Sequence, residues 1–117
     1  MKALAVTCPA AVAAIDDPDP NAGGASHKYA IQFGGPTEVC VIQFQHGPRG
    51  VEGSTPGVFE DALLAILEDR LAAFQAGPFS CTENANALTA IRDARAFQAE
   101  RTGARIAKGV LGLNEKH

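Results

Sequence analysis

The residues with the clearest capacity for chemistry are arginines, one aromatic ring and one amide. Arg49 lies in a loop dense in glycine and proline, where the backbone can approach another group closely. Arg101 and Arg105 are four residues apart, so on a helix they share one face and can reach one anion together. Phe74 and Asn84 flank a predicted turn between two helices, where Asn84 puts a polar amide near two phenylalanines. The alternative for Arg49 is an ordinary exposed loop side chain, and for Arg101 and Arg105 it is a solvated helix face. The alternative for Phe74 is a place in the core.

Catalytic and metal-binding patterns are absent from the sequence. It contains no phosphate-binding loop of the Walker type, no G-x-G-x-x-G after a strand and no H-E-x-x-H. The three histidines are far apart without ligand spacing, and the three cysteines suggest neither a zinc site nor a disulfide framework. The one enzymatic alternative is Cys81 as a nucleophile with His46 as its base. Cys81 falls in the first turn of a predicted helix, however, where a small residue is common. We therefore expect no enzyme, no metal and no cofactor.

Composition narrows the class of partner. The chain has 117 residues and a formal charge of −3, which fits one small domain and opposes a general binder of nucleic acids or membrane surfaces. Residues 92–108 carry five basic and two acidic side chains, so nucleic-acid binding there is an alternative that the overall acidity disfavours. No apolar run approaches the roughly 20 residues that cross a bilayer. Scattered cysteines favour a reduced, cytoplasmic setting.

Two helical runs, Val58–Ala76 and Cys81–Lys108, predict a helical hairpin. Gly77 and Pro78 end the first run, because proline cannot continue a helix. Thr55 and Pro56 are expected to start it, and Ser80 with Glu83 has the spacing of a capping box for the second. The apolar spacing of three and four residues predicts the facing side chains, which are Leu64, Leu67, Leu71 and Phe74 on the first helix and Leu88, Ile91, Ala94 and Phe97 on the second.

The part before the helices predicts a β-hairpin. Residues His27–Phe33 alternate between apolar and polar side chains, and Glu38–Gln45, after a Gly-Gly-Pro turn, is rich in β-branched residues. Residues 1–26 are expected to be a poorly ordered lead-in, because Asp-Pro-Asp-Pro and Gly-Gly steps interrupt any regular pattern. The predicted class is α+β, with a β-hairpin and Gly/Pro loop over residues 27–56 and a helical hairpin over residues 57–117. Two strands alone are marginal in water, so the hairpin must pack on the helices or on a second subunit.

Several strings of this sequence resemble one family, the phage anti-Thoeris sponges. They are Gln43–Pro48, Ala62–Ile66, Asp69–Leu71, Phe74–Asn84 and Arg101–Thr102, and the likeness runs from His27 to the C-terminus. These sponges are also called the first class of Thoeris anti-defence proteins. They share their helical hairpin with the second-type anti-CBASS sponge of phages. The string F-Q-x-G-P-F-x-C-x-E-N carries most of the resemblance.

The resemblance implies a non-catalytic protein that sequesters cyclic nucleotide immune signals in the host cytoplasm, encoded by a phage or prophage. It implies a homodimer or homohexamer with glycocyclic ADP-ribose bound between subunits by Arg49, Phe74 and Asn84. A second pocket for cyclic oligonucleotides would use Arg101 and Arg105. Here Leu111 and Leu113 replace an acid and a hydroxyl of the family pattern. The alternative is an oligomerisation module that binds a protein partner and no small molecule.

Overall fold

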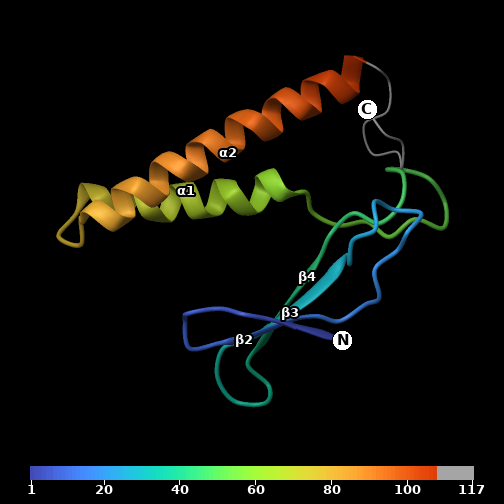
Figure 1. Cartoon of the computed structure of the whole chain (residues 1–117), viewed down its shortest axis with the longest axis horizontal. Coiled ribbons are helices and arrows are strands. Elements are labelled where there is room, and N and C mark those ends of the chain that lie inside the picture. The colour runs from blue at the N-terminus through green and yellow to red at the C-terminus, as the bar shows by residue number, and fades with distance from the viewer. Residues whose placement is uncertain (108–117) are drawn as a thin grey trace. The chain divides into compact units, whose positions relative to one another are not determined.

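The computed structural model describes residues 1–107, which form parts of two compact units that divide between Val58 and Phe59. The first unit contains a four-stranded antiparallel sheet and the second a pair of helices, as Figure 1 shows. The predicted α+β class, with strands followed by a helical hairpin, is confirmed. The strands are β1 (Lys2–Leu4), β2 (Ala11–Ala14), β3 (Lys28–Gln32) and β4 (Val39–Gln43), followed by helices α1 (Glu60–Ala76) and α2 (Thr82–Ala107).

The sheet is a meander in which each strand pairs with the next along the chain. The predicted hairpin of β3 and β4 is present, with Lys28 opposite Gln43 and Tyr29 opposite Ile42. The expectation of a poorly ordered lead-in was wrong, because β1 and β2 extend this hairpin by two strands. Strand β2 is mostly alanine, so it lacks the β-branched pattern that marks a strand in sequence. It is held by pairing with β3, and Ala14 is only 1% exposed.

A loop over residues 44–58 leaves β4 and returns to it. The N–H of Gln45 donates to the carbonyl of Val58 (3.1 Å), and the N–H of Val58 donates to the carbonyl of Gln43 (2.9 Å). Gly57 lies directly against this backbone, where a Cβ atom would collide with Gln43 and Phe44. The prediction that Thr55 starts the first helix was wrong. Helix α1 begins only at Glu60, and both backbone polar groups of Thr55 pair with His46, so Thr55 belongs to the loop.

Helices α1 and α2 form the predicted hairpin. Gly77 directly follows α1 and Pro78 comes next, as the sequence predicted for its end, and Glu60 and Asp61 occupy the first turn, where the helix dipole favours negative charge. Phe59 precedes α1 without a side-chain cap. The predicted last residue of the second helix, Lys108, lies outside the described residues. Neither helix, over residues 1–107, combines the length and apolarity needed to span a membrane.

The seam between the helices is narrower than the apolar pattern predicted. Leu88 is buried, at 7% exposure, and Leu71 and Ile91 are half-buried. Leu67 and Phe97, which we expected to face the partner helix, are 47% and 66% exposed. The predicted positions Leu64, Leu71, Leu88 and Ile91 are thus covered, whereas Leu67 and Phe97 remain largely open to solvent.

An arginine of α2 joins the two helices through charge. Arg95 donates to Asp61 (Nε to Oδ1, 3.0 Å) and to Glu68 (Nη1 to Oε1, 2.9 Å), and Arg92 Nε lies 3.6 Å from Glu68 Oε2. The hydrogen bond from Arg95 lowers the pKa of Glu68 below its ordinary value of 4.5, with the nearby Arg92 charge adding to the effect. The two carboxylates in turn raise the pKa of Arg95. These ion pairs fix the register of the hairpin where few large side chains are available.

We predict that Glu68→Gln lowers the melting temperature at pH 7 and that this difference disappears in acid. Because the folded-state pKa is depressed, the charge stabilises the fold above pH 4.5, and the stabilisation is lost as the pH falls through the lower, folded-state pKa. Thermal denaturation followed by circular dichroism from pH 7 to pH 2.5 checks this. Asp69→Asn, the same change on the exposed neighbour, is the control and should show little effect at any pH. A Glu68→Gln deficit that persists unchanged in acid would contradict the ion-pair account.

Candidate functional site

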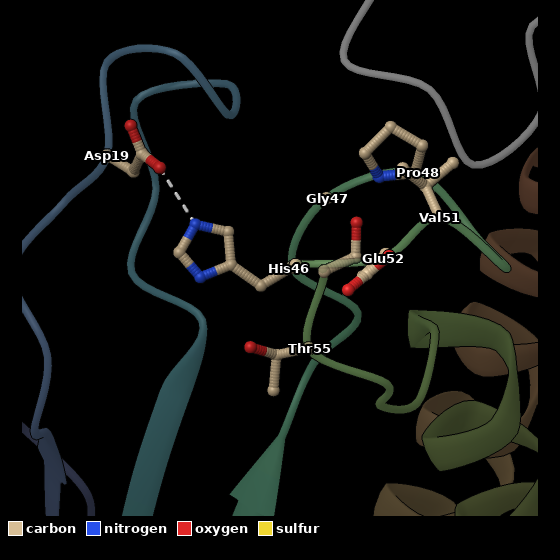
Figure 2. Close-up of a pocket in the computed structure, with 9 residues that line it drawn as sticks. Asp19, His46, Gly47, Pro48, Val51, Glu52 and Thr55 are labelled. Atoms are coloured by element: carbon tan, nitrogen blue, oxygen red, sulfur yellow. Dashed lines mark hydrogen bonds and ion pairs between the residues drawn. The ribbon is translucent and has the colours of Figure 1, made fainter.

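A pocket opens in the first unit beside the loop that follows β4 (Figure 2). Its volume is about 420 Å³, enough for a small nucleotide-sized group. Carboxylate, imidazole and hydroxyl groups stand among its walls, so the lining can both donate and accept hydrogen bonds. The lining residues are Asp19, His46, Gly47, Pro48, Val51, Glu52, Gly53, Ser54 and Thr55.

Backbone hydrogen bonds inside the loop keep this pocket open. His46 and Thr55 exchange both N–H to carbonyl bonds, at 2.9 and 2.7 Å, which closes the base of the loop. The N–H of Ser54 donates to the carbonyl of Val51 (3.1 Å), which turns the chain at the tip. Gly47 has a φ of 95°, and a Cβ atom there would meet the Ser54 side chain at 2.5 Å. Only glycine suits this position, because other residues rarely adopt that φ.

Arg49 lies in this loop between Pro48 and Gly50, and its side chain is exposed. It follows one lining residue directly, although it is not itself part of the pocket wall. The structure therefore presents the predicted guanidinium at the surface of a loop whose base is fixed. Its binding role stays a prediction.

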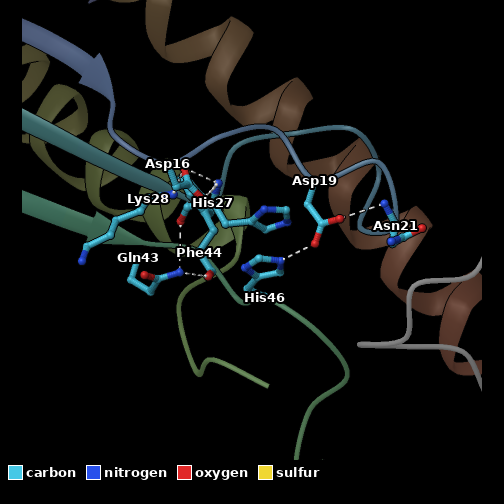
Figure 3. A network of polar contacts seen from close by, with 8 residues as sticks. All are labelled: Asp16, Asp19, Asn21, His27, Lys28, Gln43, Phe44 and His46. Carbon is cyan, nitrogen blue, oxygen red and sulfur yellow. Dashed lines mark hydrogen bonds and ion pairs between the residues drawn. The ribbon is translucent and has the colours of Figure 1, made fainter. Parts of the chain in front are cut away.

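A polar network joins the pocket to the end of the sheet (Figure 3). His46 Nε2 lies 2.8 Å from Asp19 Oδ2, and the rings of His46 and His27 stack with centroids 4.1 Å apart and planes 6° apart. The hydrogen bond with His46 lowers the pKa of Asp19, assisted by the backbone N–H of Asn21. An ionised Asp19 thus holds the imidazole of His46 at the pocket wall.

Asp16 anchors the other side of this network. Its carboxylate accepts the backbone N–H groups of His27 (2.9 Å) and Lys28 (3.0 Å). Partial burial opposes ionisation of this carboxyl, but these hydrogen bonds outweigh it, and the pKa of Asp16 falls below its ordinary value. The sequence spacing of the histidines did not reveal this cluster. The predicted hairpin could have revealed it, because its register puts His27 opposite Phe44, two residues before His46.

The second unit carries the predicted aromatic ring at the closed end of the helical hairpin. Phe74 is half-buried, and Phe79 meets its ring edge-on, with centroids 6.5 Å apart and an interplanar angle of 83°. The guanidinium carbon of Arg70 lies 5.3 Å from the centroid of the Phe74 ring, within cation–π range. Both contacts orient the ring within the hinge. Phe79 itself is 72% exposed.

The hinge is held by a different cap from the predicted one. The sequence pattern placed a capping box at Ser80 and Glu83, but α2 begins at Thr82. Cys81 precedes it, and its Sγ atom accepts the N–H of Asn84 at 3.4 Å, while Gln75 Oε1 accepts the N–H of Cys81 at 3.0 Å. Ser80 therefore lies outside the helix, in the connection between α1 and α2. The backbone of Asn84 is part of this cap, and its side chain is half-buried.

Arg101 and Arg105 lie near the end of the described part of α2, four residues apart as predicted. Arg101 is exposed, whereas Arg105 is 5% exposed, so the two guanidinium groups have different surroundings. Both take part in interactions within the protein. Their joint binding of an anion stays a prediction. Leu111 and Leu113, on which the second predicted pocket depends, lie outside the described residues.

Comparison with known proteins finds one family match and one relative for this chain. Residues 36–102 match the family described as "Acb2/Tad1, hairpin domain", which is more than half of the chain. The chain belongs to the Acb2/Tad1 hairpin-domain family. "Thoeris anti-defense 1" of Bacillus phage SBSphiJ7 is 37% identical over 95 residues, which is 80% of this chain and 65% of that relative. The chain thus spans just under two thirds of the relative's length.

The match to the Acb2/Tad1 family contains most of the predicted site. Arg49, Phe74, Asn84 and Arg101 fall within residues 36–102, and Arg105 follows shortly after. The pocket loop, α1 and most of α2 therefore lie within the matched residues. The family match begins after β3, so it excludes the first part of the histidine and carboxylate network.

We predict that Cys81→Ser raises and Cys81→Ala lowers the free energy of unfolding. A serine hydroxyl is a better acceptor for the Asn84 N–H than a thiol, and loss of a cap side chain costs about 0.5–2 kcal/mol. Urea denaturation of both variants checks this. Cys40→Ser and Cys40→Ala control for the loss of an exposed thiol, because Cys40 lies in β4 and caps no helix. Destabilisation by both changes at Cys81 would contradict the capping role.

Proposed function

We propose that this protein is a phage anti-defence protein that binds and sequesters a cyclic nucleotide signal of bacterial immunity. The class of signal we favour is a glycocyclic ADP-ribose of the Thoeris system. The observation that carries the proposal is the match to the Acb2/Tad1 hairpin domain, which includes both the Arg49 loop and the complete hinge. The name of the relative, Thoeris anti-defense 1, supports the same role.

The chemistry of three residues fits such a ligand. The exposed guanidinium of Arg49 can bind pyrophosphate oxygens with two parallel hydrogen bonds. Phe74 offers a ring oriented by Phe79 and Arg70, and a stacked base contributes about 1–3 kcal/mol. The amide of Asn84 can donate to and accept from ribose hydroxyls or a base edge. Together they supply charge, stacking and polar recognition for an ADP-ribose.

We propose that the binding protein is a homo-oligomer, either a dimer or a hexamer built from dimers. The signal would be held between subunits. The helices support this, because several large apolar side chains remain exposed on one copy of the chain. Such side chains stabilise a fold when a second copy covers them. They are Ile66, Leu67, Phe79, Phe97 and Ile106, at 58%, 47%, 72%, 66% and 60% exposure.

A second class of ligand, the cyclic oligonucleotides, would use Arg101 and Arg105. Their spacing of four residues on α2 supports a shared phosphate, with Arg101 exposed and Arg105 buried. The replacement of polar groups by Leu111 and Leu113 removes hydrogen-bonding partners from this pocket. We therefore propose weaker binding of cyclic oligonucleotides than of the ADP-ribose signal.

Sequestration without chemical conversion is the mechanism we propose. The one candidate nucleophile, Cys81, accepts a backbone hydrogen bond at a helix start, which is a structural use of a thiol. The exposed apolar side chains also favour one alternative, an oligomerisation module that binds a protein partner and no nucleotide. Calorimetric titration with a panel of cyclic nucleotides separates the two, since the module would release no heat with any of them.

We predict that Arg49→Ala and Asn84→Ala each abolish binding of the signal while the oligomer persists. The first change removes the phosphate contact and the second removes the amide that recognises the ribose or base. Isothermal titration calorimetry with glycocyclic ADP-ribose isomers measures binding, and light scattering measures the mass. Asn86→Ala, two residues further along the same helix and exposed, is the matched control and should bind normally. Wild-type affinity in both site variants would disprove the assignment.

We also predict that the bound signal is recovered chemically intact. A sponge holds its ligand without breaking a bond, so heat denaturation of the complex should release the mass that was added. Liquid chromatography with mass spectrometry of the released material checks this. Recovery of a cleaved product would show that the protein is an enzyme.

A further inference from the structure

We propose that Asp16, His27 and His46 form a binding site for a divalent transition-metal ion of the zinc type at one end of the sheet. One oxygen of Asp16 and one ring nitrogen of each histidine all lie within 4.8 Å of one another. Two imidazoles and a carboxylate are a donor set typical of zinc, cobalt or nickel, whereas calcium and magnesium prefer oxygen ligands alone. This site is separate from the nucleotide-binding residues proposed above, and the inference does not depend on them.

The topology of the sheet brings these three residues together. Asp16 follows the end of β2, His27 precedes the start of β3, and His46 follows the end of β4. In an antiparallel meander, the end of one strand and the start of the next lie at the same end of the sheet. The N–H of Phe44 donates to the carbonyl of His27 at 2.7 Å, which extends the pairing of β3 and β4 toward His46.

His27 supplies the second observation that points to a ligand. Its side chain is buried, with the residue 9% exposed, and its Nδ1 atom has no hydrogen-bond partner among residues 1–107. A buried polar atom without a partner costs about 1–3 kcal/mol, so proteins rarely keep one without a use. Coordination of a metal ion would satisfy this nitrogen. Figure 3 shows the His27 ring beside that of His46 within the network.

Asp19 holds His46 in the manner of an outer-shell carboxylate. Metal-binding histidines commonly donate their second ring N–H to a carboxylate, which fixes the tautomer and orients the ring. Asp19 Oδ2 lies 2.8 Å from Nε2 of His46, so Nδ1 of His46 is the nitrogen left to bind a metal. Asp16 is likewise oriented before any ion binds, because backbone N–H groups hold its carboxylate.

Binding requires a small movement of the two rings. Donor atoms on a tetrahedral zinc lie about 3.3 Å apart, given bond lengths of about 2.0–2.1 Å, so some separations must shorten. A metal also lies in the plane of each imidazole that binds it, and the two rings are now nearly parallel, at 6°. The rings must therefore tilt out of their stack. His46 can move more easily because it is half-buried and belongs to the pocket loop.

A metal at this site would connect the turn after β2 to the pocket loop. Asp19 and His46 line the pocket, and Arg49 lies in the same loop, so the ion would restrict the segment that presents the guanidinium. It would also place positive charge beside the pocket, which favours an anionic ligand. Three protein donors leave a coordination position for water or for an oxygen of such a ligand.

Titration of the full-length, metal-free protein with Co²⁺ tests the proposal, with visible absorption as the readout. We expect one Co²⁺ per chain and a spectrum without the intense near-ultraviolet band of thiolate ligands. Asp16→Asn and His46→Gln should each weaken binding by at least tenfold. Asp17→Asn is the matched control, because it removes a neighbouring carboxylate that is not in the cluster, and it should bind as the wild type does.

Two further measurements exclude a merely structural role of these residues. Zn²⁺ should raise the melting temperature of the wild type but not that of Asp16→Asn, because a ligand that binds only the folded state stabilises it. Asp19→Asn should keep the stoichiometry and weaken affinity by about 10–100-fold, as outer-shell changes do. Unchanged Co²⁺ binding in folded Asp16→Asn and His46→Gln, or a thiolate band in the spectrum, would overturn the proposal.

Discussion

Antiparallel pairing of β3 with β4 is the constraint on which the first unit depends. Because Lys28 pairs with Gln43, the residues just beyond the strands, His27 and Phe44, are also opposite each other. That register fixes where the next loop starts and puts His46 against His27. A shift of one residue would turn every strand side chain to the other face and separate the two imidazoles. The pocket and the polar network therefore both follow from one strand register.

The helical unit is organised by a different balance of forces. Leu71, Leu88 and Ile91 are at least half-buried in the helical unit, and Arg95 joins α1 and α2 through Asp61 and Glu68. Partly exposed ion pairs of this kind contribute little energy each, because solvent screens the charges. They define the alignment of the helices more than they stabilise it. Several larger apolar side chains, among them Leu67 and Phe97, are nevertheless exposed on this chain.

The sequence predicted those elements whose signals are local and strong. The alternating strands of the hairpin, the Gly-Pro end of α1 and the two long helices were all found. Strand β2 was missed because its alanines carry little strand signal, and pairing with β3 makes it a strand; β1, only three residues long, in turn pairs with β2. The cap of α2 was misplaced by one residue, since Cys81 is a poor capping residue by type and Ser80 a good one. The start of α1 was misplaced because Thr55 pairs across the loop with His46.

The candidate functional residues also differ in whether the sequence alone could point to them. Arg49, Phe74 and Asn84 were chosen by residue type and by the family resemblance, and their binding of a nucleotide stays a prediction. The cluster of Asp16, His27 and His46 was not chosen, because it depends on the strand register, which the spacing of the three residues along the chain does not contain. A site shared by three strand ends needs the paired backbone.

The closed base of the pocket loop has a consequence for how such proteins can diversify. Hydrogen bonds of Val58 with Gln43 and Gln45, and the exchange between His46 and Thr55, fasten the neck of the loop to β4. Residues between these anchors, apart from Gly47, can change in number and type while the anchoring hydrogen bonds to β4 are kept. The loop is thus a segment whose composition can vary independently of the strand that holds it. Variation among members of the Acb2/Tad1 family would be expected to gather in this loop first, while its anchors stay constant.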